Sequence, residues 1–475
     1  MMRWIWLLLG VPAVSAVTIH VNTGLDLIGD DGLTSLREAV IWANTNAGLD
    51  TIVLPAGTNL LSIAGTGEDA AFTGDLDFKD HTIIQGAGAR DTIIDAGGID
   101  RVMFFDHNLE IAIYDVAITG GSAGGDGGGI YNQATTRLVR CQIGGNVAQS
   151  GAGGGILNWS GALFLDQCAV YYNEAGGVGA GGIDIYTGFC SLSNCTVSGN
   201  FSWRGAGLYV DNGELRLFSC SVISNSAIDR GGGVIGNVSS MQNTLVALNQ
   251  AATGPDIYGD AGSYGFNLVS QSVGSSGYLD SDRLDTNALV GELRYYGGPT
   301  PTHNLQPGSP ALNHADPNYP TNDIAFDQRG TGYRRLRGVG VDIGSYEHQR
   351  PDHDLDGMPD EWEQANSLNP TSNEDGPQDD DEDGFSNKEE YQADTNPADE
   401  ESYFALLSFT RGQDSNRLTF VASTGRLYQA EVAPSLDDQA WTNVTAWISG
   451  QGAVSELTHT NPPADAIYRV RVRAP

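Results

Sequence analysis

Apolar, small and polar residues recur at a fixed interval between Gly127 and Asn249. Each repeat of 25–27 residues reads Gly-Gly-(Ile/Leu/Val), then about eight variable residues, then Leu-x-x-Cys-x-(Ile/Val)-x-x-Asn. The asparagines that close the repeats are Asn146, Asn173, Asn200, Asn225 and Asn249. A fixed period with fixed internal columns indicates a stacked solenoid, in which each repeat buries its apolar edge against its neighbours.

The apolar residues inside each repeat alternate as they do in half-buried strands, and the 63 glycines of the chain argue against helical repeats. In a single strand every second residue faces inward, but the inward Leu column and the inward Cys column are three residues apart. The chain must therefore bend between the two columns. These columns are Leu138, Leu165, Leu192, Leu217 and Met241, and Cys141, Cys168, Cys195, Cys220 and Thr244. With further corners at the Asn and at the Gly-rich stretch, each turn has three short strands. The sequence therefore predicts an all-β fold, a parallel β-helix.

Identical residues in successive coils lie roughly 4.8 Å apart and form ladders. We expect the Asn ladder to join side-chain amides to one another and to the turn backbone. The cysteines, including Cys190, are expected to be small buried core residues. A ladder spaces the cysteines along the solenoid axis, so they do not converge on one metal ion. Their Cβ atoms point in parallel directions, which does not suit disulfide bonds.

Residues 1–16 have the composition of a secretory signal peptide. Arg3 supplies the positive charge, Trp4–Val14 supplies the apolar stretch, and Val14-Ser15-Ala16 is a small-residue cleavage pattern. No second long apolar stretch follows. We therefore expect a mature chain without a membrane span, secreted to the extracellular space or held at the cell surface.

The regions on either side of the repeats predict a cap and a separate module. Ser35 and Glu38 have the spacing of a capping box, and the apolar residues after Ser35 follow helical spacing. We expect this helix to cap a solenoid that spans 17–347. Residues 351–402 are acidic, and 403–475 alternate as strands do, which predicts a β-sandwich-like all-β module. Trp441 and Trp447 are read as core residues of that module, with carbohydrate binding or attachment as the alternative.

Two segments resemble known families. Residues 31–39, Asp-Gly-Leu-Thr-Ser-Leu-Arg-Glu-Ala, resemble the N-terminal CSLREA motif, with Thr34 where the motif has Cys. Residues 255–347 are similar to the choice-of-anchor Q domain. The segments that carry this similarity include Gly297-Gly298-Pro299-Thr300, Asp327-Gln328-Arg329-Gly330 and Asp342-Ile343-Gly344-Ser345-Tyr346-Glu347. Together they cover roughly 18–347 and imply a secreted or surface bacterial protein with a right-handed, pectin-lyase-like β-helix, whose activity the resemblance leaves undefined.

The net charge of the chain is −35, from 24 basic and 59 acidic residues. Nucleic acid and anionic membranes are therefore not expected partners. The charge is concentrated, because 352–401 holds 19 acidic residues and a single basic one, Lys388. Such a segment requires cations or solvent.

Two 12-residue segments of this acidic region match the calcium-loop pattern D-x-D-x-D-G-x5-E. Calcium takes six to eight oxygen ligands, and alternate residues of a tight loop converge on one ion. The first predicted Ca²⁺ site is Asp352, Asp354, Asp356, the Met358 carbonyl, Asp360 and Glu363, and the second is Asp379, Asp381, Asp383, the Phe385 carbonyl, Asn387 and Glu390.

Pro351 and Pro359 argue against a paired helix-loop-helix. The region instead resembles thrombospondin type 3 or dockerin-like calcium repeats, which implies a calcium-stiffened link between domains. Helices are expected after each loop, at Glu361–Ala365 and Lys388–Ala393. The alternative is a solvated, disordered acidic linker.

The outward columns after the repeat glycines hold aromatic and charged residues. Tyr131, Trp159, Tyr186 and Tyr209 are candidates for contact with a polysaccharide or cell-surface glycan. The favoured hypothesis is non-catalytic glycan or surface binding by a monomer. A polysaccharide lyase or glycosidase is the alternative, and a structural spacer is a third reading. The catalytic candidates would be Asp184, Asp211, Arg204 and Arg230, although we expect the two arginines to pair at a corner with Asp229.

Overall fold

The structure is a computed structural model. It describes residues 16–319, 325–335, 340–348, 354, 356–412, 414–424, 426–435, 441–450, 452–463 and 466–473. Except for Ala16, the predicted signal peptide lies outside the described residues. The chain divides into two compact units. The first is Met1–Ala311 with Asp327–Gly332 and Ile343–Tyr346, and the second is Leu312–Phe326, Tyr333–Asp342 and Glu347–Pro475.

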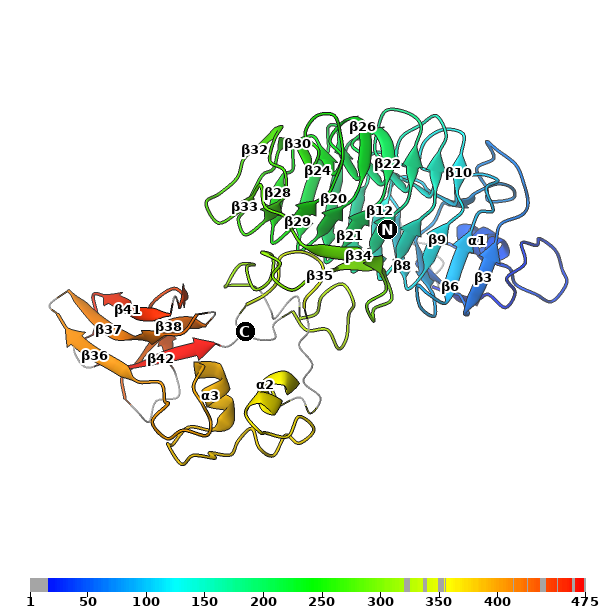
Figure 1. Ribbon diagram of the computed structural model, residues 1–475. Coiled ribbons are helices and arrows are strands. Elements are labelled where there is room, and N and C mark those ends of the chain that lie inside the picture. Colours follow the sequence, from blue (N-terminus) through cyan, green and yellow to red (C-terminus); the bar gives the residue numbers. More distant parts are fainter. Residues whose placement is uncertain are drawn as a thin grey trace, which may run out of the picture. The chain divides into compact units, whose positions relative to one another are not determined.

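The first unit is a parallel β-solenoid, as the repeats predict, and Figure 1 shows its stacked coils. Sheet 1 contains β1 (Thr18–His20), β2 (Asp50–Val53), β5 (Thr82–Gln85), β8 (Glu110–Tyr114), β12 (Thr135–Val139), β16 (Ala162–Asp166), β20 (Phe189–Ser193), β24 (Glu214–Phe218) and β28 (Ser240–Gln242). Sheet 2 contains β3 (Gly57–Leu60), β6 (Thr92–Asp95), β9 (Ala117–Thr119), β13 (Gln142–Gly144), β17 (Ala169–Tyr171), β21 (Thr196–Ser198), β25 (Ser221–Ile223), β29 (Leu245–Ala247), β31 (Leu268–Val269) and β33 (Arg283–Leu284).

The remaining strands of the coils form two more sheets. Sheet 3 contains β4 (Leu76–Phe78), β7 (Met103–Phe105), β11 (Ile130–Asn132), β15 (Ile156–Asn158), β19 (Ile183–Ile185), β23 (Leu208–Val210), β27 (Val234–Ile235), β30 (Ile257–Asp260) and β32 (Ser275–Ser276). Sheet 4 contains β10 (Ser122–Ala123), β14 (Val147–Ala148), β18 (Glu174–Ala175), β22 (Phe201–Arg204) and β26 (Ser226–Arg230). The expectation of three strands per turn is therefore wrong for these five coils, because each has a short fourth strand, which in four of them directly follows the Asn of the repeat.

The predicted bend between the Leu and Cys columns is confirmed. The residue before each Cys-column position has a left-handed backbone, and the five are Arg140, Gln167, Asn194, Ser219 and Asn243, with φ between 50° and 55°. This single left-handed residue turns the chain from sheet 1 into sheet 2, so that Leu and Cys both face inward. All five cysteines are buried and free of disulfides, as expected.

The predicted N-terminal helix is α1 (Leu36–Thr45), which contacts β2 and β4. The capping box is formed, since Ser35 Oγ accepts from Glu38 N at 3.1 Å and Glu38 accepts from Ser35 N at 2.9 Å. Arg37 is fully buried and binds Asp26 through Nε at 2.7 Å and Nη2 at 3.1 Å. The residues of the CSLREA-like segment thus fix the helix to the first coils.

The segment 290–305 covers part of the outer face of sheet 2. It includes a hairpin of β34 (Val290–Arg294) and β35 (Thr302–Leu305). Thr196 Oγ1 lies 2.9 Å from Thr302 Oγ1, and Ser198 Oγ lies 2.9 Å from His303 Nε2. Because these side chains are buried, the cover replaces solvent on one face of the coils.

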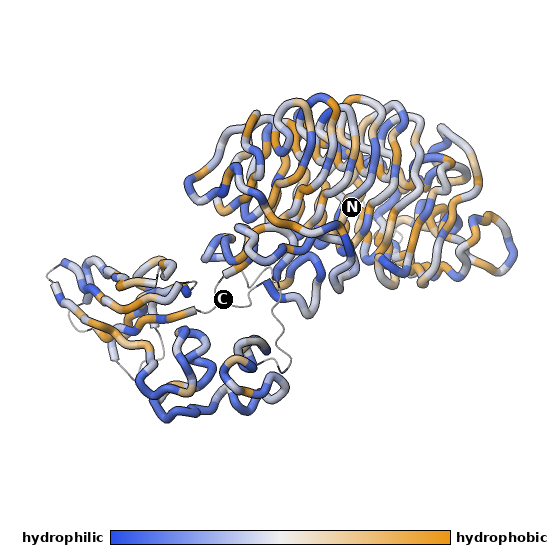
Figure 2. The backbone as a smooth tube through the Cα atoms, viewed as in Figure 1, coloured by the Kyte–Doolittle hydropathy of each residue, from blue (hydrophilic) through white to orange (hydrophobic). Residues whose placement is uncertain are grey.

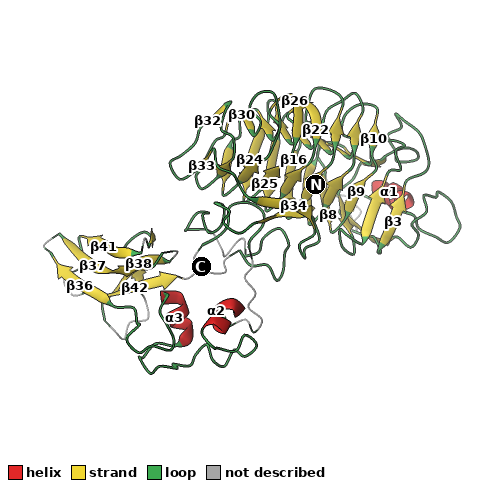
Figure 3. Cartoon of the chain, in the orientation of Figure 1, coloured by secondary structure: helices red, strands yellow, loops and turns green. Residues whose placement is uncertain are grey.

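Within its described residues, the second unit holds two short helices and two antiparallel sheets, which confirms an antiparallel β module (Figure 3). The helices are α2 (Asp360–Ala365) and α3 (Asn387–Ala393). The strands are β36 (Leu406–Arg411), β37 (Ser415–Ala422), β38 (Leu427–Ala433), β39 (Thr442–Asn443), β40 (Ile448–Ser449), β41 (Ala453–Thr460) and β42 (Ile467–Arg473).

The core of this module contains Leu418, Phe420, Tyr428 and Leu457. Trp441 and Trp447 are half-buried, so their expected place in the core is wrong. The guanidinium of Arg469 lies 4.3 Å from the ring centre of Trp441. Figure 2 shows that apolar residues are concentrated along the strands, whereas the chain around α2 and α3 is mostly hydrophilic.

No helix among the described residues is both long and apolar enough to cross a membrane.

Candidate functional site

The first acidic loop gathers four carboxylates that lie before, on and after α2. Oxygens of Asp354, Asp356, Glu363 and Asp375 all lie within 4.8 Å of one another. Glu363 is fully buried, and neither of its carboxylate oxygens has a hydrogen-bond partner among the described residues. The predicted ligand Asp352 lies outside the described residues.

Backbone geometry explains how the first loop closes. Gly357 has φ of 100°, which a residue with a side chain rarely adopts, and the next residue, Met358, is fully buried. Met358 N donates to Asp356 Oδ1 at 2.8 Å, so the loop turns around its own carboxylates. Asp360 is the first residue of α2 and adds to the negative potential at Glu363.

The second loop repeats this arrangement before α3. Oxygens of Asp379, Asp381 and Asp383 lie within 4.8 Å of one another, and Gly384 has φ of 96°. The two ligands predicted on α3 are buried, Asn387 fully and Glu390 with 1 % exposure. Asn387 Oδ1 and Glu390 Oε2 have no hydrogen-bond partner among the described residues. Phe385, predicted to act through its carbonyl, donates its N–H to Asp383 Oδ1 at 2.8 Å.

The charges of both clusters favour either protons or a cation. Burial and the neighbouring Asp354, Asp356 and Asp375 raise the pKa of Glu363 to about 7. Burial together with Asp381 and Asp383 raises the pKa of Glu390 to about 7. Buried carboxylate oxygens without donors, gathered on tight loops, are the donor set that a hard divalent cation takes. The residues therefore fit calcium.

The sequence patterns do not predict Asp375, which belongs to the first cluster. It lies outside both 12-residue segments, so the calcium-loop pattern contains no position for it. Its place in the cluster depends on how the linker between the loops folds back.

A stack of aromatic rings runs along the outer face of sheet 3. The ring centres of Trp159 and Tyr186 are 4.2 Å apart with planes 11° from parallel, and those of Tyr131 and Trp159 are 6.3 Å apart at 26°. Phe104, in register with Tyr131 one coil earlier, extends the stack at 5.3 Å. We call Phe104, Tyr131, Trp159 and Tyr186 the aromatic stack. Tyr209 on β23 pairs in register with Asp184 on β19 and belongs to the same sheet face.

The catalytic candidates occupy the same face and the neighbouring corner. Asp184 is buried and accepts from Ala180 N at 2.9 Å. Burial, with smaller contributions from Asp126 and Asp211, raises the pKa of Asp184 to about 7. Asp211 is exposed and accepts from Asn212 Nδ2 at 2.9 Å.

The two corner arginines share one carboxylate, as expected. Arg204 Nε and Arg230 Nε lie 2.6 and 3.1 Å from Asp229 Oδ2. The hydrogen bond from Arg204 and the charge of Arg230 hold the pKa of Asp229 below its usual range. Both arginines are therefore engaged in ion pairs and are poor general bases in this arrangement.

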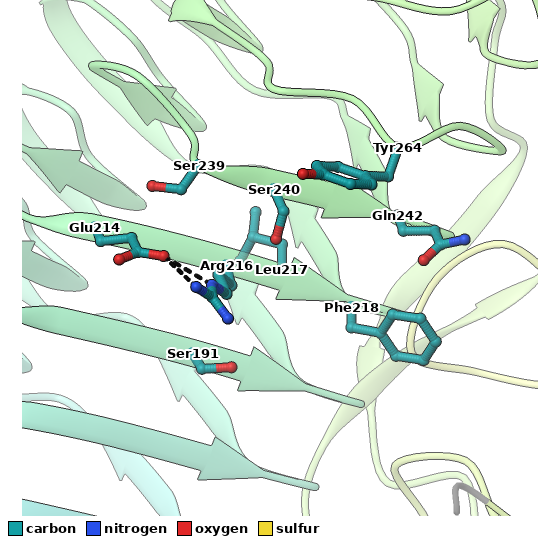
Figure 4. A pocket seen from close by; sticks show the side chains of 9 residues that line it. All are labelled: Ser191, Glu214, Arg216, Leu217, Phe218, Ser239, Ser240, Gln242 and Tyr264. Carbon is teal, nitrogen blue, oxygen red and sulfur yellow. Dashed lines mark hydrogen bonds and ion pairs between the residues drawn. The ribbon is translucent and has the colours of Figure 1, made fainter. Parts of the chain in front are cut away.

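A separate pocket of about 520 Å³ lies on the outer face of sheet 1 (Figure 4). Arg216 Nε donates to Glu214 at 2.8 Å on its floor, and the Arg216 guanidinium lies 5.0 Å from the ring centre of Phe189. Tyr264 lines the pocket from the loop of a later coil. No pattern within a single repeat predicts this pocket, because its lining comes from several coils.

The described residues define a parallel β-solenoid protein that carries a separate antiparallel β module. Comparison with protein-family models and with curated proteins finds no match for this chain.

Proposed function

We propose that this chain is a secreted or cell-surface β-helix protein that binds a glycan without cleaving it, and that calcium orders its acidic region. The CSLREA-like segment, the similarity of 255–347 to the choice-of-anchor Q domain and the composition of residues 1–16 support the location. The aromatic stack supports the glycan, and the two carboxylate clusters support the calcium.

The proposal of glycan binding is based mainly on the aromatic stack. Aromatic side chains combine a large apolar body with a polar tip, which suits the mixed C–H and hydroxyl surface of a sugar, and sugar hydroxyls bond to nearby polar side chains. Tyr186 keeps 40 % of its surface exposed, and Gln133 and Asp211 lie in the same outward column as Trp159 and Tyr186. An extended chain of sugars could therefore lie along the stack.

The proposed calcium ligands are the residues of the two carboxylate clusters and the buried polar residues of α2 and α3. Asp354, Asp356, Glu363 and Asp375 would hold one ion, and Asp379, Asp381, Asp383, Asn387 and Glu390 the other. The ions would neutralise carboxylates that otherwise repel one another. Glu363, Asn387 and Glu390 lie on α2 and α3, so they orient the helices relative to the loops.

Cleavage of a polysaccharide is the second candidate, and Asp184 is the observation that favours it. A carboxyl with a pKa of about 7 can act as a general acid near neutral pH. Against this role, Asp184 is only 3 % exposed, and both corner arginines are bound to Asp229.

A glycan-binding and degradation screen on residues 17–475, with calcium and with a chelator, tests these functions. Our proposal expects retention of at least one glycan and no shorter products. Products that disappear in Asp184→Asn would establish cleavage instead. Failure to bind every glycan tested would leave the molecule a structural spacer and overturn the proposal.

A further inference from the structure

We propose that Asp375 is a ligand of the first calcium site and that it couples this site to the second, so that the two ions bind cooperatively. This inference rests on the proposed calcium binding. It goes further, because Asp375 lies in neither loop pattern and connects two sites that the sequence presents as separate.

The side chain of Asp375 faces the first site. One of its oxygens lies within 4.8 Å of oxygens of Asp354, Asp356 and Glu363. Asp375 Oδ1 is buried without a hydrogen-bond partner among the described residues, while Oδ2 accepts from Asn369 N at 2.7 Å. The carboxylate is thus oriented by one oxygen and presents the other to the cluster.

The backbone of Asp375 is held by the second site. Asn387 Nδ2 donates to the Asp375 carbonyl at 2.9 Å, and Asn387 Oδ1 is the buried oxygen without a partner in the second loop. One amide therefore binds the linker with its nitrogen and offers its oxygen to the second ion.

Further hydrogen bonds fix the same linker to the first turn of α3. Asn387 N donates to Gln378 O at 2.7 Å, and Lys388 N donates to Gly376 O at 3.1 Å. Lys388 Nζ also donates to the Asp356 carbonyl in the first loop. The start of α3 thus contacts both the linker that carries Asp375 and the first loop itself.

These contacts give the direction of the coupling. An ion in the second loop orders Asn387 and Glu390, and with them the start of α3. The ordered α3 holds the linker in place, and the linker places Asp375 among the ligands of the first ion. The entropy of ordering the linker is then lost once for both ions, so the first site binds more tightly when the second is filled.

Calorimetric titration of the chelator-treated mature chain with Ca²⁺ tests this coupling. We expect two ions per chain with positive cooperativity. Asp375→Asn keeps the shape of the side chain and should weaken one ion at least tenfold, and Asp375→Ala should weaken it further. The matched control is Glu374→Gln, which removes a charge from the exposed neighbouring residue and should leave both affinities unchanged.

The coupling itself is tested by Glu390→Gln, which alters only the second loop. We expect the ion that remains in the first loop to bind at least fivefold more weakly than in the unaltered chain. Equal affinity of that ion in Glu390→Gln, or an Asp375→Asn titration identical to that of Glu374→Gln, would overturn the inference while leaving calcium binding intact. No binding to the unaltered chain would overturn the calcium proposal as well.

Discussion

Each asparagine of the repeat binds its neighbours in the coils before and after it. Asn200 Nδ2 donates to Asn225 Oδ1 at 2.8 Å and to the Val170 carbonyl at 3.1 Å, and its Oδ1 accepts from Asn173. The ladder ends at Asp256, whose Oδ1 accepts from Asn249 Nδ2 at 2.8 Å. The ladder residues are buried, so each amide satisfies backbone groups that no water reaches.

Asn200→Ala is expected to lower the free energy of unfolding of the solenoid by about 1–3 kcal/mol, because it leaves the buried Asn173 N–H without its acceptor and removes the hydrogen bonds from the Asn200 amide to Asn225 and Val170. Urea unfolding followed by circular dichroism measures this loss. Asn212→Ala, at an exposed asparagine, is the control and should change stability by less than about 0.5 kcal/mol. Equal midpoints for the two variants would contradict a structural role for the ladder.

At the scale of elements, sequence patterns predict a helix, bend or strand well when all the residues that form the pattern lie in one repeat or one cap. The capping box at Ser35, the bend before the Cys column and the helices after the acidic loops all follow from local patterns, and α2 and α3 begin within one residue of their expected starts. Sheet 4 was missed because most of its strands are only two residues long, too short for alternation to show. Asp375 and the pocket at Arg216 were missed because contacts between distant segments create them.

The two acidic loops should make the calcium-free protein sensitive to pH. Glu363 and Glu390 have pKa values of about 7 in the folded chain against 4.5 ordinarily, so the folded state holds their protons more tightly than the unfolded state. Their contribution to stability is therefore present below about pH 4.5 and is lost as the pH rises towards 7. Calcium replaces the protons, so its affinity should fall as the pH drops through the same window.

Thermal scans with chelator at pH 5 and pH 8 check this expectation. Trp362 reports on the region, because its ring centre lies 5.1 Å from that of Tyr391. The calcium-free transition should occur at a lower temperature at pH 8, and saturating calcium should remove the difference. The double substitution Glu363→Gln and Glu390→Gln should flatten the pH dependence without calcium. A calcium-free transition temperature that rises with pH would show that Glu363 and Glu390 do not hold their protons more tightly in the folded chain.

At the scale of the whole molecule, the chain combines a parallel β-solenoid with a second unit that holds the acidic loops and the β module. Within that second unit, Arg426 connects α3 to the β module. Its Nη2 donates to Tyr391 O and to Asp394 Oδ1, both at 2.9 Å, and its Nε donates to Gln392 O at 3.1 Å. Arg426 is only 6 % exposed, so these bonds satisfy the end of α3 away from water.

Arg426→Ala should lower the stability of the second unit by about 1–3 kcal/mol, because it leaves carbonyls at the end of α3 without donors. It should also reduce the stabilisation that calcium gives to the β module, since α3 carries Asn387 and Glu390. Differential scanning calorimetry with and without calcium measures both effects. Arg417→Ala, which removes an exposed arginine 3.7 Å from Glu456, is the control. A calcium response equal to that of Arg417→Ala would show that Arg426 does not transmit it.

We propose that the outer face of sheet 3 binds glycan through the aromatic stack without cleaving it. The glycan that binds most tightly in the screen is titrated against the unaltered chain, Trp159→Ala and Tyr264→Ala, and the three dissociation constants are compared. The reaction products are analysed in parallel. We expect at least tenfold weaker binding for Trp159→Ala, about 1.4 kcal/mol. We also expect unchanged binding for Tyr264→Ala, an exposed tyrosine away from the stack, and no shortened glycan. Equal affinity of the glycan for Trp159→Ala and Tyr264→Ala, or the release of shorter chains, would rule out non-catalytic glycan binding by the aromatic stack.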